Sequence, residues 1–278
     1  MVKIKNIPPV ISGVVIIIII GIIMQLPFDK IITELNFSTF HIEYLVLTVK
    51  MSLIFLLSLI LVSNLKEKAL SGLSSNYKWS FKFINFIPFY LFLLGISTFI
   101  SKDLSQISSY NLLLLLIACL MVGFAEEFIF RGFLQPLFIK KYISHKNGIF
   151  LGVLFPALFF GASHLLNLTV NNNIPQVIGQ SIYAIFIGFF FGVALLKTNK
   201  LIPLAITHGL INFFFLFSSL PNLNNITDID KEATIEITLA EQISSSIVPL
   251  FIFLPLFIVG LILIRKINKE QIQERINL

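Results

Sequence analysis

Residues 111–138 read NLLLLLIACLMVGFAEEFIFRGFLQPLF, an apolar run interrupted by two adjacent carboxylates and an arginine. About 20 predominantly apolar residues are enough to cross the roughly 30 Å hydrocarbon core of a bilayer as a helix. Each charge at the centre of such a helix costs about 2.5–3.5 kcal/mol. The stretch therefore predicts a membrane-spanning helix in which Glu126, Glu127 and Arg131 serve a function.

The rest of the chain has the same character. Its 278 residues are 56% hydrophobic and 12% charged, with a mean hydropathy of +0.93, whereas soluble domains carry roughly 25% charged residues. Backbone polar groups in lipid must be satisfied within the segment, so the apolar runs predict helices. The sequence predicts an all-α, polytopic membrane protein that forms a single membrane domain over residues 1–278. About eight transmembrane helices are expected, at 8–28, 42–65, 83–100, 111–137, 149–168, 177–196, 201–220 and 243–264.

The distribution of Lys and Arg predicts the orientation in the membrane. If both termini lie on one side of eight spans, that side carries fifteen of these residues and the other side carries three, Lys30, Lys102 and Lys231. Cytoplasmic loops are enriched in Lys and Arg, so both termini and the 138–148 loop are expected in the cytoplasm. The acidic loop at 228–241 is then expected outside. The net charge of +6 indicates topology and no nucleic-acid partner, because the basic residues form no single face.

Helical spacing separates the polar residues of the fourth span. Glu127 and Arg131 are four residues apart on one helix face, in the favourable order for an ion pair. Glu126 points about 100° away from Glu127 and is free to face another helix. Lys50, the second cation inside a span, is expected to extend its ammonium group toward the membrane interface.

Two further motifs place polar residues at the same spacing. Phe160 and His164 share a face of the fifth span, and His208 and Asn212 share a face of the seventh. A lone intramembrane His or Asn often only links helices by hydrogen bonds. Together with the two glutamates, however, these groups form an acid–base set on three helices that packing alone does not require.

The three motifs carry a family resemblance. EExxxR stands here as EEFIFR at 126–131, FxxxH as FGASH at 160–164 and HxxxN as HGLIN at 208–212. In this order on membrane helices they resemble the CPBP family of CAAX-protease and bacteriocin-processing proteins, also called Abi, which includes the type II CAAX prenyl endopeptidases. The resemblance covers roughly residues 110–220, the expected catalytic core.

This resemblance implies an intramembrane endopeptidase. Glu126 would be the catalytic carboxylate that, with His164, activates a water molecule to attack a peptide carbonyl. His208 and Asn212 would stabilise the oxyanion that develops in the transition state. Donors aimed at such an oxyanion in a water-poor site contribute several kcal/mol. The supporting residues would be Glu127 and Arg131.

The cofactor requirement has two readings. Glu126, His164 and His208 are the ligand types that a catalytic zinc ion takes. The sequence lacks HExxH, and a carboxylate paired with a neighbouring His can activate water without an ion. A metal-free mechanism is the favoured expectation, and zinc bound by these three residues is the alternative.

Other function classes remain open. A non-catalytic membrane scaffold, or a bacteriocin self-immunity or regulatory protein of the same family, is the main alternative. A transporter is disfavoured, because transporters usually show internal repeats and this chain shows none. The chain is rich in Ile, Asn and Lys, with 17 Lys against 3 Arg, which suggests an AT-rich bacterial genome and therefore a bacterial cell membrane. The expected partners are membrane lipid and a peptide or membrane-protein substrate.

The depth of the motif residues suggests how the site is reached. At 1.5 Å per residue, His208 lies about 12 Å from Lys200, whereas Glu126 lies about 21 Å from Lys140. For the two to meet, the fourth and fifth helices must extend into the cytoplasm or tilt strongly. A cavity open to the cytoplasmic side is the expected result.

Overall fold

The computed structural model describes residues 7–33, 37–65, 67–73, 86–100, 102–223 and 239–277, which form helices and connecting turns with no β-strand among them. The helices are α1 (Pro9–Met24), α2 (Phe28–Thr33), α3 (Thr39–Leu65), α4 (Phe86–Ile100), α5 (Ser109–Glu127), a π-helix (Phe128–Leu134), α6 (Gln135–Tyr142), α7 (Gly148–His164), α8 (Ile174–Thr198), α9 (Leu201–Leu216), α10 (Leu239–Ile264) and α11 (Lys269–Asn277). Short 3₁₀ turns follow at Leu104–Gln106, Leu165–Thr169 and Phe217–Ser219.

The all-α, polytopic architecture expected from the sequence is confirmed. Seven helical segments of the described residues are long and apolar enough to cross a membrane. The remaining expected span, 83–100, appears as α4, whose 15 residues extend about 22 Å, less than a hydrocarbon core. Most of the acidic 228–241 loop lies outside the described residues.

The fourth expected span is much longer than a bilayer requires. α5, the π-helix and α6 form one helical segment of 34 residues, Ser109–Tyr142, which extends about 51 Å. The π-helix widens the turn that follows the two glutamates, and such turns often lie at functional sites. Within this π-helix, the Gly132 carbonyl accepts a hydrogen bond from the Ser71 hydroxyl at 2.7 Å. Of the two helices that the depth argument expected to extend beyond the membrane, the fourth is therefore long enough to do so, whereas the fifth has 22 residues at Gly148–Thr169.

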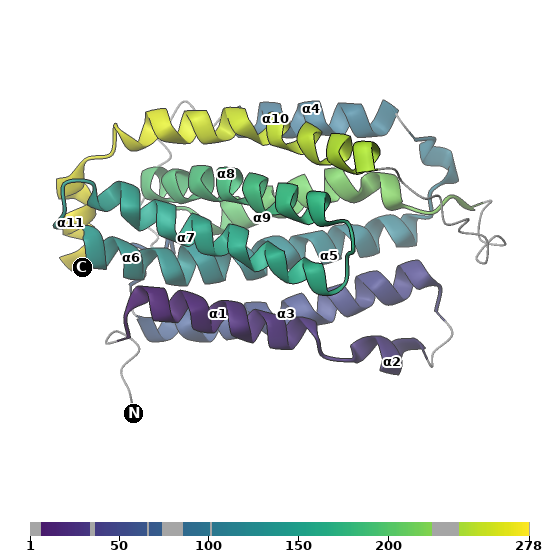
Figure 1. Cartoon of the computed structure of the whole chain (residues 1–278), viewed down its shortest axis with the longest axis horizontal. Helices are drawn as coiled ribbons and strands as arrows, with labels where there is room; N and C mark the ends of the chain where they lie inside the picture. Colours follow the sequence, from purple (N-terminus) through teal and green to yellow (C-terminus); the bar gives the residue numbers. More distant parts are fainter. Residues whose placement is uncertain are drawn as a thin grey trace.

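The helices lie roughly parallel or antiparallel to one another in three layers (Figure 1). α1 and α3 form one outer layer, and α4 and α10 form the other. Between them lie α5 to α9, and α8 is the most buried of the candidate spans, with 67% of its apolar window inside the molecule. The middle layer carries the three motifs, so their residues face the interior.

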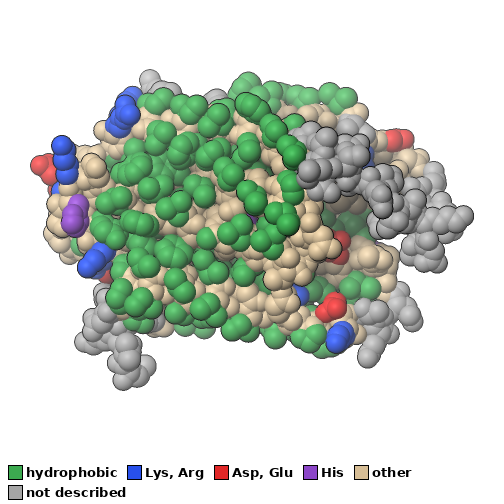
Figure 2. Space-filling model, viewed as in Figure 1, with side chains coloured by type: hydrophobic (Ala, Val, Ile, Leu, Met, Phe, Trp, Pro, Cys, Tyr) green, Lys and Arg blue, Asp and Glu red, His purple; other side chains and the backbone are tan. Residues whose placement is uncertain are grey.

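Most of the described Lys and Arg residues belong to segments at the end of the bundle that carries α11; Figure 2 shows several of them there, while hydrophobic side chains cover the middle. We call this the basic end, formed by the 67–73 turn and the α6–α7, α8–α9 and α10–α11 connections. Three contacts bring these segments together there: Lys140 pairs with Glu67 at 2.7 Å, Lys197 donates to the Lys266 carbonyl at 2.6 Å, and Arg275 donates to the Leu196 carbonyl at 2.9 Å. Away from this end, Lys50 near the middle of α3 donates to the Met24 carbonyl, where α1 ends, at 2.7 Å.

Candidate active site

The two adjacent glutamates at the end of α5 have different surroundings. The Glu127 side chain is fully buried, whereas that of Glu126 is 17% exposed. Successive helical residues point about 100° apart, so one carboxylate faces the packed interior and the other faces the cavity described below. The sequence argument that they differ therefore matches their placement.

Arg131 neutralises the buried glutamate. Its Nη1 donates to Glu127 Oε1 at 2.9 Å, and both side chains are almost completely buried. The guanidinium carbon lies 4.3 Å from the centre of the Phe160 ring, a distance at which a cation is attracted to the ring face. The ion pair that the four-residue spacing predicted is present, and it fixes Glu127 relative to α7.

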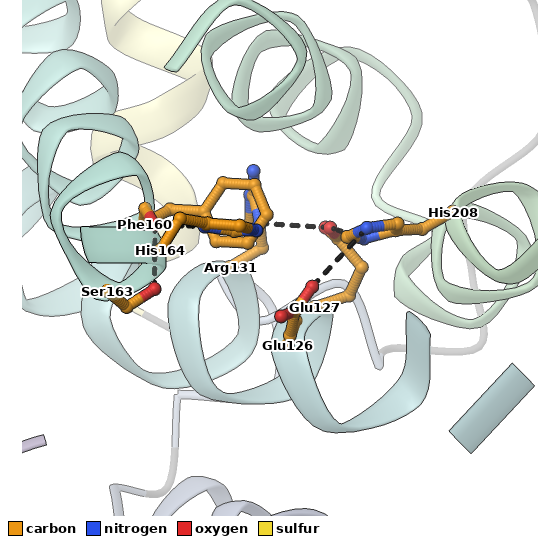
Figure 3. Close-up of polar contacts among 7 residues, drawn as sticks. All are labelled: Glu126, Glu127, Arg131, Phe160, Ser163, His164 and His208. Atoms are coloured by element: carbon orange, nitrogen blue, oxygen red, sulfur yellow. Dashed lines mark hydrogen bonds and ion pairs between the residues drawn. The ribbon is translucent and has the colours of Figure 1, made fainter. Parts of the chain in front are cut away.

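His208 joins the two glutamates across a helix interface. Its Nδ1 lies 2.8 Å from Glu127 Oε1, and its Nε2 lies 3.3 Å from Glu126 Oε2. The ring is held edge-on by Phe160 and Phe191, at centroid distances of 5.8 and 5.9 Å. Figure 3 shows the imidazole beside both carboxylates. The sequence did not indicate this bridge, because the residues are 81 positions apart.

His164 is oriented by its own helix. Its Nδ1 lies 2.9 Å from the Phe160 carbonyl oxygen, and because a carbonyl only accepts, that nitrogen carries the proton. In the neutral form of the ring, Nε2 is then the acceptor. The Phe160 ring packs edge-on against the imidazole at 4.8 Å, as their shared helix face predicted. The hydroxyl of Ser163 donates to the same carbonyl at 2.7 Å.

Close contact between α5 and α9 brings the glutamates to His208. A Cβ atom on Gly123 would lie 2.3 Å from the Ala205 carbonyl oxygen, and one on Gly209 would lie 2.8 Å from the Leu120 Cα. Only residues without a side chain permit this approach. Since Gly209 follows His208 directly and Gly123 lies one turn before Glu126 and Glu127, the crossing determines the geometry of the site.

A cavity of about 790 Å³ adjoins these groups. Glu126, His164, His208 and Asn212 all line it, so the structure brings together the four residues expected to be catalytic. Asn212 is half-buried and makes no side-chain hydrogen bond with the described residues. Ser163 also lines the cavity; it lies within the FGASH motif, but nothing in its residue type singled it out.

The cavity extends away from the basic end. In five helices the lining residues lie mainly in the part that is farther from the basic end. They come from residues 17–25 of α1 and its C-terminal flank, 47–54 of α3, 160–170 of α7 and the turn after it, 180–187 of α8 and 208–216 of α9. The cavity expected from the sequence opens on the side of the basic loops, which are predicted to be cytoplasmic, whereas the lining residues lie away from those loops. The depth argument took Lys200 as the membrane edge, but Thr198 and Asn199 beside it are 1% and 3% exposed, because the 67–73 turn and α11 cover that turn at the basic end.

The described residues do not assemble the ligand set of the zinc alternative. No three His, Cys, Asp or Glu side chains of that part of the chain lie together in a way that could hold a metal ion. Both ring nitrogens of His208 face carboxylates. Glu126, His164 and His208 therefore do not fit a zinc site in this arrangement.

One comparison with known proteins identifies a family. Residues 108–214 match the family described as Type II CAAX prenyl endopeptidase Rce1-like. No curated protein and no solved structure matches the chain. The matched segment contains all three motifs and extends over less than half of the chain. The family resemblance drawn from the motifs is confirmed.

Proposed function

We propose that this chain, which belongs through residues 108–214 to the Rce1-like family of type II CAAX prenyl endopeptidases, is an intramembrane endopeptidase. It hydrolyses a peptide bond in a membrane-associated peptide or protein. The observation that carries this proposal is the contact of Glu126 and Glu127 with His208 at the wall of a cavity that His164 also lines. An acid–base set inside a cavity is what peptide hydrolysis in a membrane requires.

Glu126 is the proposed base that activates water. It is the partly exposed carboxylate of the pair, and it lines the cavity. The Nε2 of His164 is an acceptor once Nδ1 donates to Phe160, so a second group is available to take a proton. The water oxygen attacks the carbonyl carbon while its proton passes to the base. That proton then goes to the leaving amine as the C–N bond breaks.

His208 and Asn212 are the proposed oxyanion donors. A doubly protonated His208 would donate from Nδ1 to Glu127 and from Nε2 toward Glu126 or the cavity. The four groups Arg131, Glu127, His208 and Glu126 would then balance to zero net charge, as a buried polar cluster requires. The Asn212 amide lies one turn farther along α9 and faces the same cavity. Both donors would strengthen their bonds as the oxyanion forms.

The test is comparative peptidomics of membranes that contain the wild-type chain or Glu126→Gln. The amide keeps the shape of the side chain but cannot act as a base, so peptides released by the enzyme should fall by about 10²–10⁴-fold while the protein still accumulates. Glu43→Gln is the matched control, since this exposed glutamate of α3 lies outside the cavity. Identical peptide profiles for wild-type and Glu126→Gln membranes would favour the non-catalytic scaffold or immunity protein.

A metal-free mechanism is part of the proposal. Both ring nitrogens of His208 face carboxylates, so they are not available to a metal ion. His164 Nε2 is the remaining nitrogen acceptor, and one ligand does not make a zinc site. We expect purified enzyme in detergent to retain its activity after exhaustive chelation, with metal content measured on the same sample. Loss of activity together with stoichiometric zinc, and recovery on adding zinc back, would instead support Glu126, His164 and His208 as ligands.

A further inference from the structure

The interior of the bundle differs on the two sides of the site. Between the site and the basic end, large side chains fill the core. Phe130, Leu134 and Phe138 of the long helix are fully buried, as are Phe191 and Leu195 of α8. On the other side lies the cavity, which reaches Val170, a residue that is 80% exposed. A substrate can therefore reach Glu126 through the cavity and not through the packed half.

The charge distribution assigns a side of the membrane to each half. The basic end carries the connections rich in Lys and Arg (Figure 2), and fifteen such residues against three favour that side as cytoplasmic. α1 begins and α3 ends at the basic end (Figure 1), and the cavity uses the later part of α1 and the earlier part of α3. The cavity thus lies in the half of the bundle that faces away from the cytoplasm.

The lining of the cavity is uncharged apart from the site itself. Glu126 is its only carboxylate, and no Lys or Arg is among the described residues that line it. Its outer part carries two hydrogen-bonded pairs of neutral side chains: Gln25 Nε2 donates to Thr169 Oγ1 at 2.9 Å, and Asn167 Nδ2 donates to Gln180 Oε1 at 2.8 Å. The remaining walls are mostly Ile, Leu, Val and Phe. Away from the site, a charged group in this space would lack a counter-ion among the described residues, which is costly in a desolvated site.

We propose that the substrate is an uncharged, apolar peptide segment that enters from the extracytoplasmic half of the membrane. Such a segment is the membrane-embedded part of an exported or membrane-anchored peptide, cut on its outer side. This inference rests on the proposed endopeptidase function and adds the side of entry and the character of the residues around the cleaved bond. A peptide that ends in a free carboxylate in the cytoplasm does not fit, because the cavity faces away from the basic end and no Lys or Arg among the described residues lines it.

Cysteine labelling tests the side of entry without reference to activity. In a Cys119→Ser background, Val170→Cys places a thiol at the exposed edge of the cavity, and Lys146→Cys places one at the basic end. Intact cells that express each variant are treated with a membrane-impermeant maleimide. Val170→Cys should react in intact cells, and Lys146→Cys should react only after the membrane is permeabilised. The reverse pattern would overturn the inference.

A second measurement links the cavity to cleavage. The Val170→Cys cells are treated with a bulky impermeant maleimide, and peptides that depend on Glu126 are then quantified. Blocking the cavity should lower them at least tenfold, and their cleavage sites should be flanked by uncharged residues. Undiminished release, or cleavage beside charged residues, would contradict the inference while leaving the endopeptidase intact. If Val170→Cys is labelled from outside but no released peptide depends on Glu126, the proposed function is rejected, whereas the inferred orientation of the cavity is still supported.

Discussion

Glu126 and Glu127 are neighbours in the chain, but they belong to different parts of the site. Glu127 is enclosed by Arg131 and His208 and has no exposed surface. Glu126 lies beside the other nitrogen of the same imidazole and borders the cavity. A buried charge held by two partners is suited to orienting a neighbour, and a carboxylate at a cavity is suited to reacting with water.

The Glu127→Gln variant tests this division of roles. It would leave Arg131 as a buried cation without a charged partner and would remove the acceptor at His208 Nδ1. Breaking a buried pair by removing one partner typically costs about 3–5 kcal/mol. We expect a clear fall in the melting temperature of the purified protein and lower activity, whereas Glu126→Gln should lower activity with little effect on melting.

A double variant separates charge from shape. Glu127→Gln combined with Arg131→Met removes both charges, so no unpaired cation remains, and the melting temperature should recover in part. Activity should stay low, because His208 has lost its carboxylate. Equal melting temperatures and equal activities for wild-type and Glu127→Gln would show that the ion pair has no supporting role.

At the scale of helices, the crossing of α5 and α9 positions the site. Gly123 and Gly209 let the two backbones approach until a Cβ would meet backbone atoms of the other helix. Backbone atoms cannot rotate away as a side chain can, so the contact sets the distance between the helices. The 2.8 Å contact of His208 with Glu127 depends on that distance.

Gly123→Ala should therefore disturb the geometry of the site, although Gly123 is not one of the site's polar residues. The new methyl group would lie 2.3 Å from the Ala205 carbonyl, and the helices would have to separate. We expect a lower melting temperature and a loss of activity larger than the fraction of unfolded protein explains. Gly21→Ala on α1 is the control for the melting temperature alone, because its Cβ would lie 3.4 Å from a Leu166 methyl group, an ordinary contact, and Gly21 lines the cavity. Wild-type behaviour of Gly123→Ala in both measurements would contradict this account.

At the scale of the whole molecule, the fold combines a packed half with a hollow half. The basic end is closed by fully buried aromatic and aliphatic side chains and by α11, whose Ile272 is 1% exposed. The other half leaves about 790 Å³ open to the site. This division places Glu126 and His208 at mid-depth of the bundle with access from one direction, which is why the proposed entry of a substrate depends on the side of the membrane.

Much of this architecture follows from the sequence alone. The apolar runs predicted helices because lipid cannot satisfy a free backbone, and that requirement is local to each segment. The Glu127–Arg131 pair and the Phe160–His164 contact were likewise predictable, since both join residues four positions apart on one helix. The spacing of three short motifs was enough to indicate the family that residues 108–214 match.

Other features depend on contacts between helices, which no local pattern encodes. The bridge from His208 to both glutamates joins residues from α5 and α9 and exists because Gly123 and Gly209 let these helices meet. The π-helix after Glu127 and the burial of the α8–α9 turn changed the depth at which the motif residues lie. The direction of the cavity was mispredicted for this reason. Helix formation is decided by hydrogen bonds within each segment, whereas the location of empty space is decided by how the side chains of all the helices pack together.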